Sequence, residues 1–144
     1  MIIIGSDHGG FELKSKVIEH LKKKNIEVED YGCYSKDSVD YPDIAQKVCQ
    51  AVAEGKAKRA ILICGTGIGI SIAANKMHGI RAALCHSCFD ARMCRMHNDA
   101  NVLCMGERTT GQGVALDIVD AFLSASFEGD RHTARVNKIK ALEE

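Results

Sequence analysis

Short apolar runs alternate along the chain with longer segments whose apolar residues recur at helical spacing. The short runs are rich in β-branched and aliphatic residues and predict strands at residues 1–5, 26–32, 59–64, 79–85 and 100–106. Between and after them the apolar period changes to three or four residues. This change predicts helices over residues 11–24, 44–55, 67–77, 89–99, 111–125 and 131–143.

Apolar strands separated by helices are typical of a parallel sheet that is covered by helices on both faces. The chain has 144 residues, which suffices for one sizeable core but not for two ordinary domains. We therefore expect a single domain over residues 1–144. Its predicted fold class is α/β, a three-layer αβα sandwich around a doubly wound, five-stranded parallel sheet of Rossmann or flavodoxin type.

The simplest strand order for such a sheet is 2-1-3-4-5, which puts the topological switch point between the first and third strands. Ligands bind at the carboxyl ends of the strands beside that point. The loops that follow these two strands read "SDHGG" and "CGTGIG". They are therefore expected to face each other across a crevice.

Charge and hydropathy exclude several classes of partner. The 19 basic and 19 acidic side chains give a formal net charge of zero, so the overall balance favours neither a nucleic acid nor a membrane partner. The chain contains no run of about 18 apolar residues, which a transmembrane helix would need. Its first residues meet an acid and glycines too early for a signal peptide. We expect a cytoplasmic protein.

The chain contains seven cysteines, an odd number, and several of them lie within apolar runs. This usage favours reduced thiols over a disulfide scaffold. Only Cys85 and Cys88 have the spacing of zinc ligands, and no second pair completes a site. We interpret most of these cysteines as small buried apolar residues and expect no metal.

The glycines of the loop "CGTGIG" leave the backbone open at a predicted helix start. Without side chains at Gly65, Gly67 and Gly69, N–H groups there can point at an anion, which the helix dipole also favours. A phosphate or an oxyanion is the expected guest, and a tight turn that binds nothing is the alternative. The spacing is not that of a Walker loop, and Ile70 and the absence of a ribose-binding acid argue against a dinucleotide fingerprint. A receiver domain would need an aspartate where Cys64 stands.

Cys64 ends a strand beside a helix start, a position that favours the thiolate and suits a general base or a nucleophile. Cys64 and Ser71 have the spacing of a cysteine phosphatase, but Ile70 replaces the arginine that would grip the phosphate. Asp7 and His8 in the facing loop add groups that exchange protons near neutral pH. Taken singly, Asp7 also suits a helix cap and His8 an exposed turn.

The last predicted helix carries a candidate phosphate site. Arg131 and Arg135 lie one turn apart, which lets two guanidiniums converge on one phosphate. His132 lies beside them, and Arg108 follows the fifth strand. A solvated basic face is the alternative. Another face of the helix is apolar and could dock on the chain itself or on a second subunit, through Val136, Ile139 and Leu142.

Six segments, taken together, resemble the type B ribose-5-phosphate isomerase family and its galactose-6-phosphate isomerase relatives. They read "SDHGGFELK", "DYPDIA", "ILICGTGIGISIAANK", "GIRAA", "HNDANVLCMG" and "EGDRHTARV" and cover nearly the whole chain in order. The resemblance implies an enzyme without metal or other cofactor. It would interconvert ribose 5-phosphate and ribulose 5-phosphate through an enediolate, as in the non-oxidative pentose phosphate pathway.

The resemblance also implies residue roles. Cys64 matches the base that moves a proton between C2 and C1, and His97 matches the imidazole that opens the sugar ring. Some family members carry a glutamate as base where this chain has Ile70, which points to the branch that uses cysteine. Thr66, in the same loop as Cys64, is also expected to be a catalytic residue. The implied substrate-binding residues are Asp7, His8, Gly65, Thr66, Gly67, Ile68, Gly69, Asn98, Arg108, Arg131, His132 and Arg135.

In that family two subunits share each site, so at least a homodimer is implied, with a tetramer as the alternative. Three other functions stay open. A related isomerase would act on allose or galactose 6-phosphate, or on free allose or psicose. A non-catalytic sensor would bind a sugar phosphate without turnover, and a cysteine phosphatase would release phosphate, although Ile70 counts against it.

Overall fold

The computed structural model describes residues 1–143 and contains one sheet of five parallel strands. The strands are β1 (Ile2–Ser6), β2 (Val28–Asp30), β3 (Arg59–Cys64), β4 (Ala82–Leu84) and β5 (Val102–Gly106). Each lies within or within one residue of a predicted run. The predicted fold class, a doubly wound parallel sheet, is confirmed.

The predicted strand order is wrong at one edge of the sheet. The observed order is β2-β1-β3-β5-β4, so β5 lies beside β3 and β4 takes the edge. All five residues of β5 are buried, whereas the three residues of β4 are only partly buried. A strand that is apolar on both faces gains most from a central place, and edges are commonly made of very short strands.

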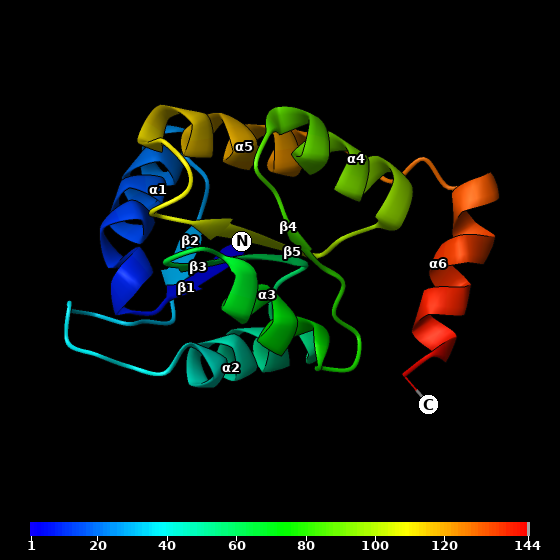
Figure 1. Ribbon diagram of the computed structural model, residues 1–144. Helices are drawn as coiled ribbons and strands as arrows, with labels where there is room; N and C mark the ends of the chain where they lie inside the picture. Colours follow the sequence, from blue (N-terminus) through cyan, green and yellow to red (C-terminus); the bar gives the residue numbers. More distant parts are fainter. Residues whose placement is uncertain (144) are drawn as a thin grey trace.

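Helices cover both faces of the sheet (Figure 1). They are α1 (Phe11–Lys23), α2 (Tyr41–Ala53), α3 (Ile68–Asn75), α4 (Cys88–Asn98), α5 (Gln112–Ser124) and α6 (Arg131–Ala141). One core joins the sheet to α1, α4 and α5, and the other joins it to α2 and α3. All six predicted helices are present. Helix α2 begins three residues before its predicted start, because Pro42 lies inside its first turn.

Successive side chains of β3 pack alternately into the two cores on opposite faces of the sheet. Ile61 and Ile63 pack with α1, α4 and α5, whereas Leu62 and Cys64 pack with α2 and α3. This alternation follows from the two-residue period of a strand. It places the Cys64 side chain on the face of α2 and α3, at the carboxyl end of a central strand.

Helix α6 lies outside the three layers, beyond the end of the sheet opposite to the turn after β3 (Figure 1). It packs chiefly against α4, and its buried residues are His132 and Val136. Ile139 and Leu142 are 44% and 83% exposed. The apolar face predicted for this helix is thus covered only in part.

Within residues 1–143, no helix combines the length and the apolar character needed to cross a bilayer.

Candidate active site

The loops that follow β1 and β3 lie against each other, as predicted. The N–H of Asp7 donates to the carbonyl of Ile63 at 3.2 Å. A Cβ atom added at Gly9 would lie 3.3 Å from the nitrogen of Gly65, so the two backbones approach closely. Both unusual loops therefore lie together at the carboxyl ends of β1 and β3.

Hydrogen bonds hold the side chains of Asp7 and His8 at this end of the sheet. Oδ1 of Asp7 accepts a hydrogen bond from the N–H of Gly10 at 3.1 Å and caps the short 3₁₀ turn His8–Gly10. Nδ1 of His8 accepts from the N–H of Val39 at 3.2 Å, so the proton of the neutral ring sits on Nε2. The capping role considered for Asp7 is thus observed, and the His8 ring presents a donor.

Cys64 is held by the turn that follows it. Its Sγ accepts a hydrogen bond from the N–H of Gly67 at 3.1 Å, and the side chain is 4% exposed. Gly67 adopts a left-handed conformation with φ of 77°, and a Cβ atom there would lie 2.5 Å from Cδ1 of Leu84. Only glycine fits this place. The turn therefore holds the sulfur of Cys64 beside the start of α3.

The other thiols lie in different surroundings, although all seven cysteines are free. Burial raises the pKa of Cys49 to about 12 and holds the pKa of Cys104 well above its usual value. A hydrogen bond with Cys94 raises the pKa of Cys85 as well. These buried groups stay protonated at neutral pH and act as packing.

The two residues that follow β5 hold the glycine turn through backbone hydrogen bonds. The N–H groups of Glu107 and Arg108 donate to the carbonyls of Cys64 and Gly65 at 3.0 and 2.9 Å. As a result the Arg108 side chain lies over the turn, with Nη1 3.5 Å from where a Cβ of Gly65 would be. A cation and the amino-terminal turn of α3 thus border the same space.

The rim of the turn contains both expected and unexpected residues. Thr66 and Ile68 are exposed, and Oγ1 of Thr66 accepts from the N–H of Ile68 at 3.2 Å. A Cβ atom at Gly69 would lie 2.6 Å from the ring of Tyr41, which begins α2. Tyr41 was not predicted as a site residue, although an aromatic residue directly before Pro42 in the segment "DYPDIA" was a signal for it.

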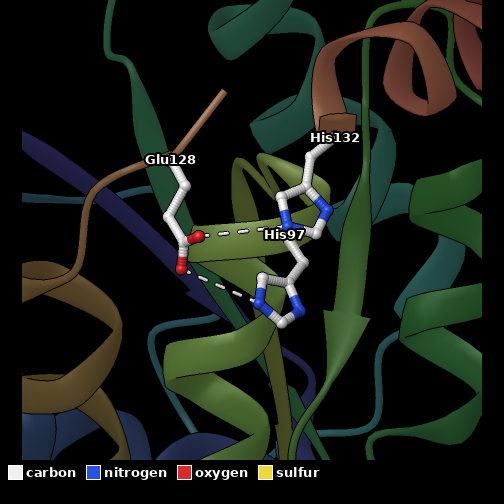
Figure 2. Close-up of side chains that lie close together, drawn as sticks. All are labelled: His97, Glu128 and His132. Atoms are coloured by element: carbon white, nitrogen blue, oxygen red, sulfur yellow. Dashed lines mark ion pairs between the residues drawn. The ribbon is translucent and has the colours of Figure 1, made fainter. Parts of the chain in front are cut away.

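A second cluster lies where α4 meets the start of α6 (Figure 2). The rings of His97 and His132 stack, with centroids 4.3 Å apart and planes 13° apart. The Glu128 carboxylate faces both rings, with Oε1 3.8 Å from Nε2 of His97 and Oε2 3.9 Å from Nε2 of His132. Glu128 was not predicted as a site residue, although it lies four residues before His132 in the sequence.

His132 is buried, at 5% exposure, and within the described residues its Nε2 has no hydrogen-bond partner. Burial lowers the pKa of His132, and the cationic Arg131 lowers it further. The imidazole is therefore neutral at neutral pH. Around it, Asn98, Arg131 and Arg135 are exposed, and the two arginines lie one turn apart on α6 as predicted.

The two clusters lie at opposite ends of the sheet. Cys64 ends β3, whereas α4 carries His97 and Asn98 back to the amino end of β5. The carbonyl of Asn101 accepts from the N–H of Ala60, near the start of β3. The six residues of β3 span roughly 17–20 Å at about 3.3 Å each.

One chain therefore does not bring the second cluster to Cys64. It also separates Arg108, which lies over the Cys64 turn, from Arg131 and Arg135, with which the sequence had grouped it. Any site that uses all of these residues must draw on two copies of the chain.

Comparison with known proteins gives a consistent result over the whole length. The family model described as ribose/galactose isomerase matches residues 2–139. Ribose-5-phosphate isomerase B of Escherichia coli is 50% identical over 143 residues, which cover 99% of this chain and 96% of that protein.

Solved structures agree in fold as well as in sequence. The structure of Clostridium thermocellum ribose-5-phosphate isomerase B superposes with a TM-score of 0.97 at 56% identity, covering 99% of this chain and 96% of that one. Ribose-5-phosphate isomerase B of Mycoplasma genitalium, solved with bound ribulose-5-phosphate, gives 0.94 at 46% identity, with 99% and 95% covered. Since the family model and these relatives match nearly every residue, the chain belongs to the ribose/galactose isomerase family.

Proposed function

We propose that this chain is a ribose-5-phosphate isomerase, which interconverts D-ribose 5-phosphate and D-ribulose 5-phosphate without a metal. The observation that carries the proposal is the turn around Cys64, where a buried thiol and the first N–H groups of a helix share one space. An aldose–ketose isomerase needs one group that moves a proton and donors for the oxygen that becomes negative.

In the proposed reaction the thiolate of Cys64 removes the proton from C2 of the open aldose. The electron pair forms the C1–C2 double bond, and the charge on the carbonyl oxygen is stabilised by N–H groups between Gly65 and Gly69. The C2 hydroxyl proton passes to the oxygen on C1, and the thiol returns the abstracted proton to C1 as the C2 carbonyl forms, which gives the ketose. A positioned base contributes about 10²- to 10⁴-fold, and each oxyanion donor about 10²- to 10³-fold.

The site is completed by a second copy of the chain. His97 protonates the ring oxygen of the cyclic sugar as the C1–O bond breaks and the anomeric hydroxyl loses its proton to solvent, which supplies the open aldose. Arg108 lies beside the Cys64 turn, and Arg131 and Arg135 of the second copy join it on the phosphate. The remaining contacts to the sugar come from Asp7, His8, Thr66 and Ile68 of one copy and Asn98 and His132 of the other.

Exposed apolar residues support a homodimer as the smallest working assembly. Ile68 and Ile72 on α3, beside the Cys64 turn, are 52% and 58% exposed, and Leu142 after α6 is 83% exposed. Apolar surface of this kind is buried at subunit interfaces.

Free thiols suit a reducing compartment, so we place this single sugar-phosphate isomerase domain in the cytoplasm.

The test is the rate of ketose formation from ribose 5-phosphate in the presence of EDTA. We expect turnover by the unaltered protein and, for Cys64→Ala, a rate at least about 10²-fold lower with near-normal binding of ribose 5-phosphate by calorimetry. Cys88→Ala removes a half-buried thiol on α4 and is the matched control.

Two results would contradict the proposal. Retention of more than about a tenth of the rate by Cys64→Ala would remove Cys64 as the base. No turnover by the unaltered protein would overturn the pentose assignment, and hexose 6-phosphates would then be the next substrates to assay. Binding without turnover of any sugar phosphate would favour a sensor.

A further inference from the structure

Three side chains that commonly ligate metals converge where α4, α6 and the segment before α6 meet. One ligand atom from each of His97, Glu128 and His132 lies within 4.8 Å of the other two (Figure 2). Two imidazoles and one carboxylate, with a position left for water, form a frequent ligand set for zinc and related divalent metals. The mechanism proposed above uses none of these groups as metal ligands.

An independent observation also points to a ligand at this place. His132 is 5% exposed, and its Nε2 finds no hydrogen-bond partner among the described residues although it faces Glu128 across 3.9 Å. Buried ring nitrogens are normally paired, because an unpaired one loses its hydration without compensation. An ion between the ring and the carboxylate would satisfy Nε2.

The cluster can tighten around an ion by side-chain rotation. Metal–ligand bonds of about 2.0–2.2 Å in a tetrahedral site put ligand atoms about 3.3–3.6 Å apart, closer than the 3.8 and 3.9 Å that now separate Glu128 from the two rings. His97 and Glu128 have side-chain exposures of 36% and 37% and have room to move, whereas His132 is fixed by burial. The His97 ring must tilt out of its stack on His132 to aim its lone pair at the ion.

We propose that His97, Glu128 and His132 form a binding site for Zn²⁺ or a similar divalent transition metal. Each imidazole binds through an unprotonated nitrogen, and Glu128 supplies the negative charge. Arg131 and Arg135 on the same helix oppose a cation, so the site depends strongly on that carboxylate. Mg²⁺ prefers oxygen ligands in octahedral geometry and should not bind.

Metal binding at this site would inhibit the enzyme, an expectation that rests on the proposed function. If His97 opens the sugar ring, an ion bound to its nitrogen takes away the proton donor and inhibits turnover of the cyclic sugar. Zinc would then be an inhibitor of an enzyme that needs no metal. Binding of the ion does not depend on this consequence.

The binding test uses the full chain with Cys64→Ala, stripped of metal by a chelator, so that the thiol of the turn does not compete. Co²⁺ is added as a visible probe, and Zn²⁺ is then used to displace it. We expect one Co²⁺ per chain, visible absorption without a thiolate charge-transfer band, and no response to Mg²⁺. Adding Glu128→Gln should weaken binding at least about tenfold, whereas the control Glu54→Gln, at an exposed residue after α2, should leave it unchanged.

Three results would overturn the site assignment. They are the absence of Co²⁺ binding, a thiolate charge-transfer band in the Co²⁺ spectrum, and equally tight Co²⁺ binding with and without Glu128→Gln. The inhibition arm uses protein with Cys64 intact and expresses each rate relative to the same variant without zinc. We expect inhibition that EDTA reverses and that Glu128→Gln shifts at least about tenfold to higher zinc. Binding without inhibition would overturn the role of His97 and leave the metal site standing, whereas absent binding would leave the isomerase assignment untouched.

Discussion

At the scale of single residues, the His97 ring is partly exposed and lies beside the buried ring of His132 and the Glu128 carboxylate. It is half-buried in the stack on His132 and faces the Glu128 carboxylate at 3.8 Å. In the proposed mechanism the His97 ring supplies the proton that ring opening needs, whereas Cys64, at the other end of the sheet, moves the proton between C2 and C1. Ring opening and proton transfer are therefore assigned to different residues, His97 and Cys64, and can be separated by substrate.

His97→Asn should slow turnover of cyclic ribose 5-phosphate much more than turnover of a four-carbon aldose phosphate. The shorter sugar carries its phosphate on the oxygen that would close a five-membered ring, so it stays open. We expect the loss in kcat/KM to be at least about tenfold larger for ribose 5-phosphate. Equal losses on both sugars would show that His97 does not act in ring opening.

At the scale of elements, the join between β3 and α3 determines the geometry of the Cys64 turn. Gly67 is both the N-cap of α3 and the donor to Cys64, and its left-handed φ of 77° aims that N–H. Gly55, at the end of α2, has a similar φ of 83° but no atom within 4 Å of an added Cβ. The two glycines thus differ in crowding and share their backbone conformation.

This pair allows a matched comparison. Gly55→Ala should lower the free energy of unfolding by about 1–2 kcal/mol, the ordinary strain of a left-handed residue, and leave the isomerase rate unchanged. Gly67→Ala adds a clash with Leu84 and moves the N–H, so we expect a larger loss of stability and a rate at least about 10²-fold lower. Denaturant titration and the ketose assay measure the two effects. A fully active Gly67→Ala would mean that the turn is not the oxyanion site.

Element identity could be predicted from the sequence here, because apolar period and turn residues are local properties. The run Arg59–Cys64 was predicted residue for residue. The order of β4 and β5 could not be read in the same way, because it depends on which strand the finished sheet buries more completely. The pairing of Gly69 with Tyr41 and the position of Glu128 between two histidines are likewise tertiary contacts, and spacing along the chain only hints at them.

At the scale of the whole molecule, the separation of the two clusters follows from the direction of α4. A helix that returns the chain to a parallel strand ends at the amino edge of the sheet, so residues at its end, such as His97, cannot lie beside Cys64 in the same chain. The sequence could have predicted this separation from topology alone. It does not predict which surfaces would join two chains in the proposed shared site.

Two inactive variants should therefore restore activity when they are combined. If Cys64→Ala and His97→Asn chains are mixed after unfolding and refolded together, random pairing makes half of the dimers mixed, and each mixed dimer has one site with both intact residues. We expect about a quarter of the normal activity, measured by the ketose assay. Each variant refolded alone is the control, and no recovery in the mixture would contradict a site shared between chains.

The position of the two clusters at opposite ends of the sheet also has a genetic meaning. If two chains share each site as proposed, a chain damaged at one end would leave about half of the sites intact in a cell with one normal and one altered gene copy, as simple gene dosage would. A chain damaged at both ends would spoil both sites of every mixed dimer, so only about a quarter would survive. The second lesion would behave as a dominant allele and the first as a recessive one, although both chains are equally inactive by themselves.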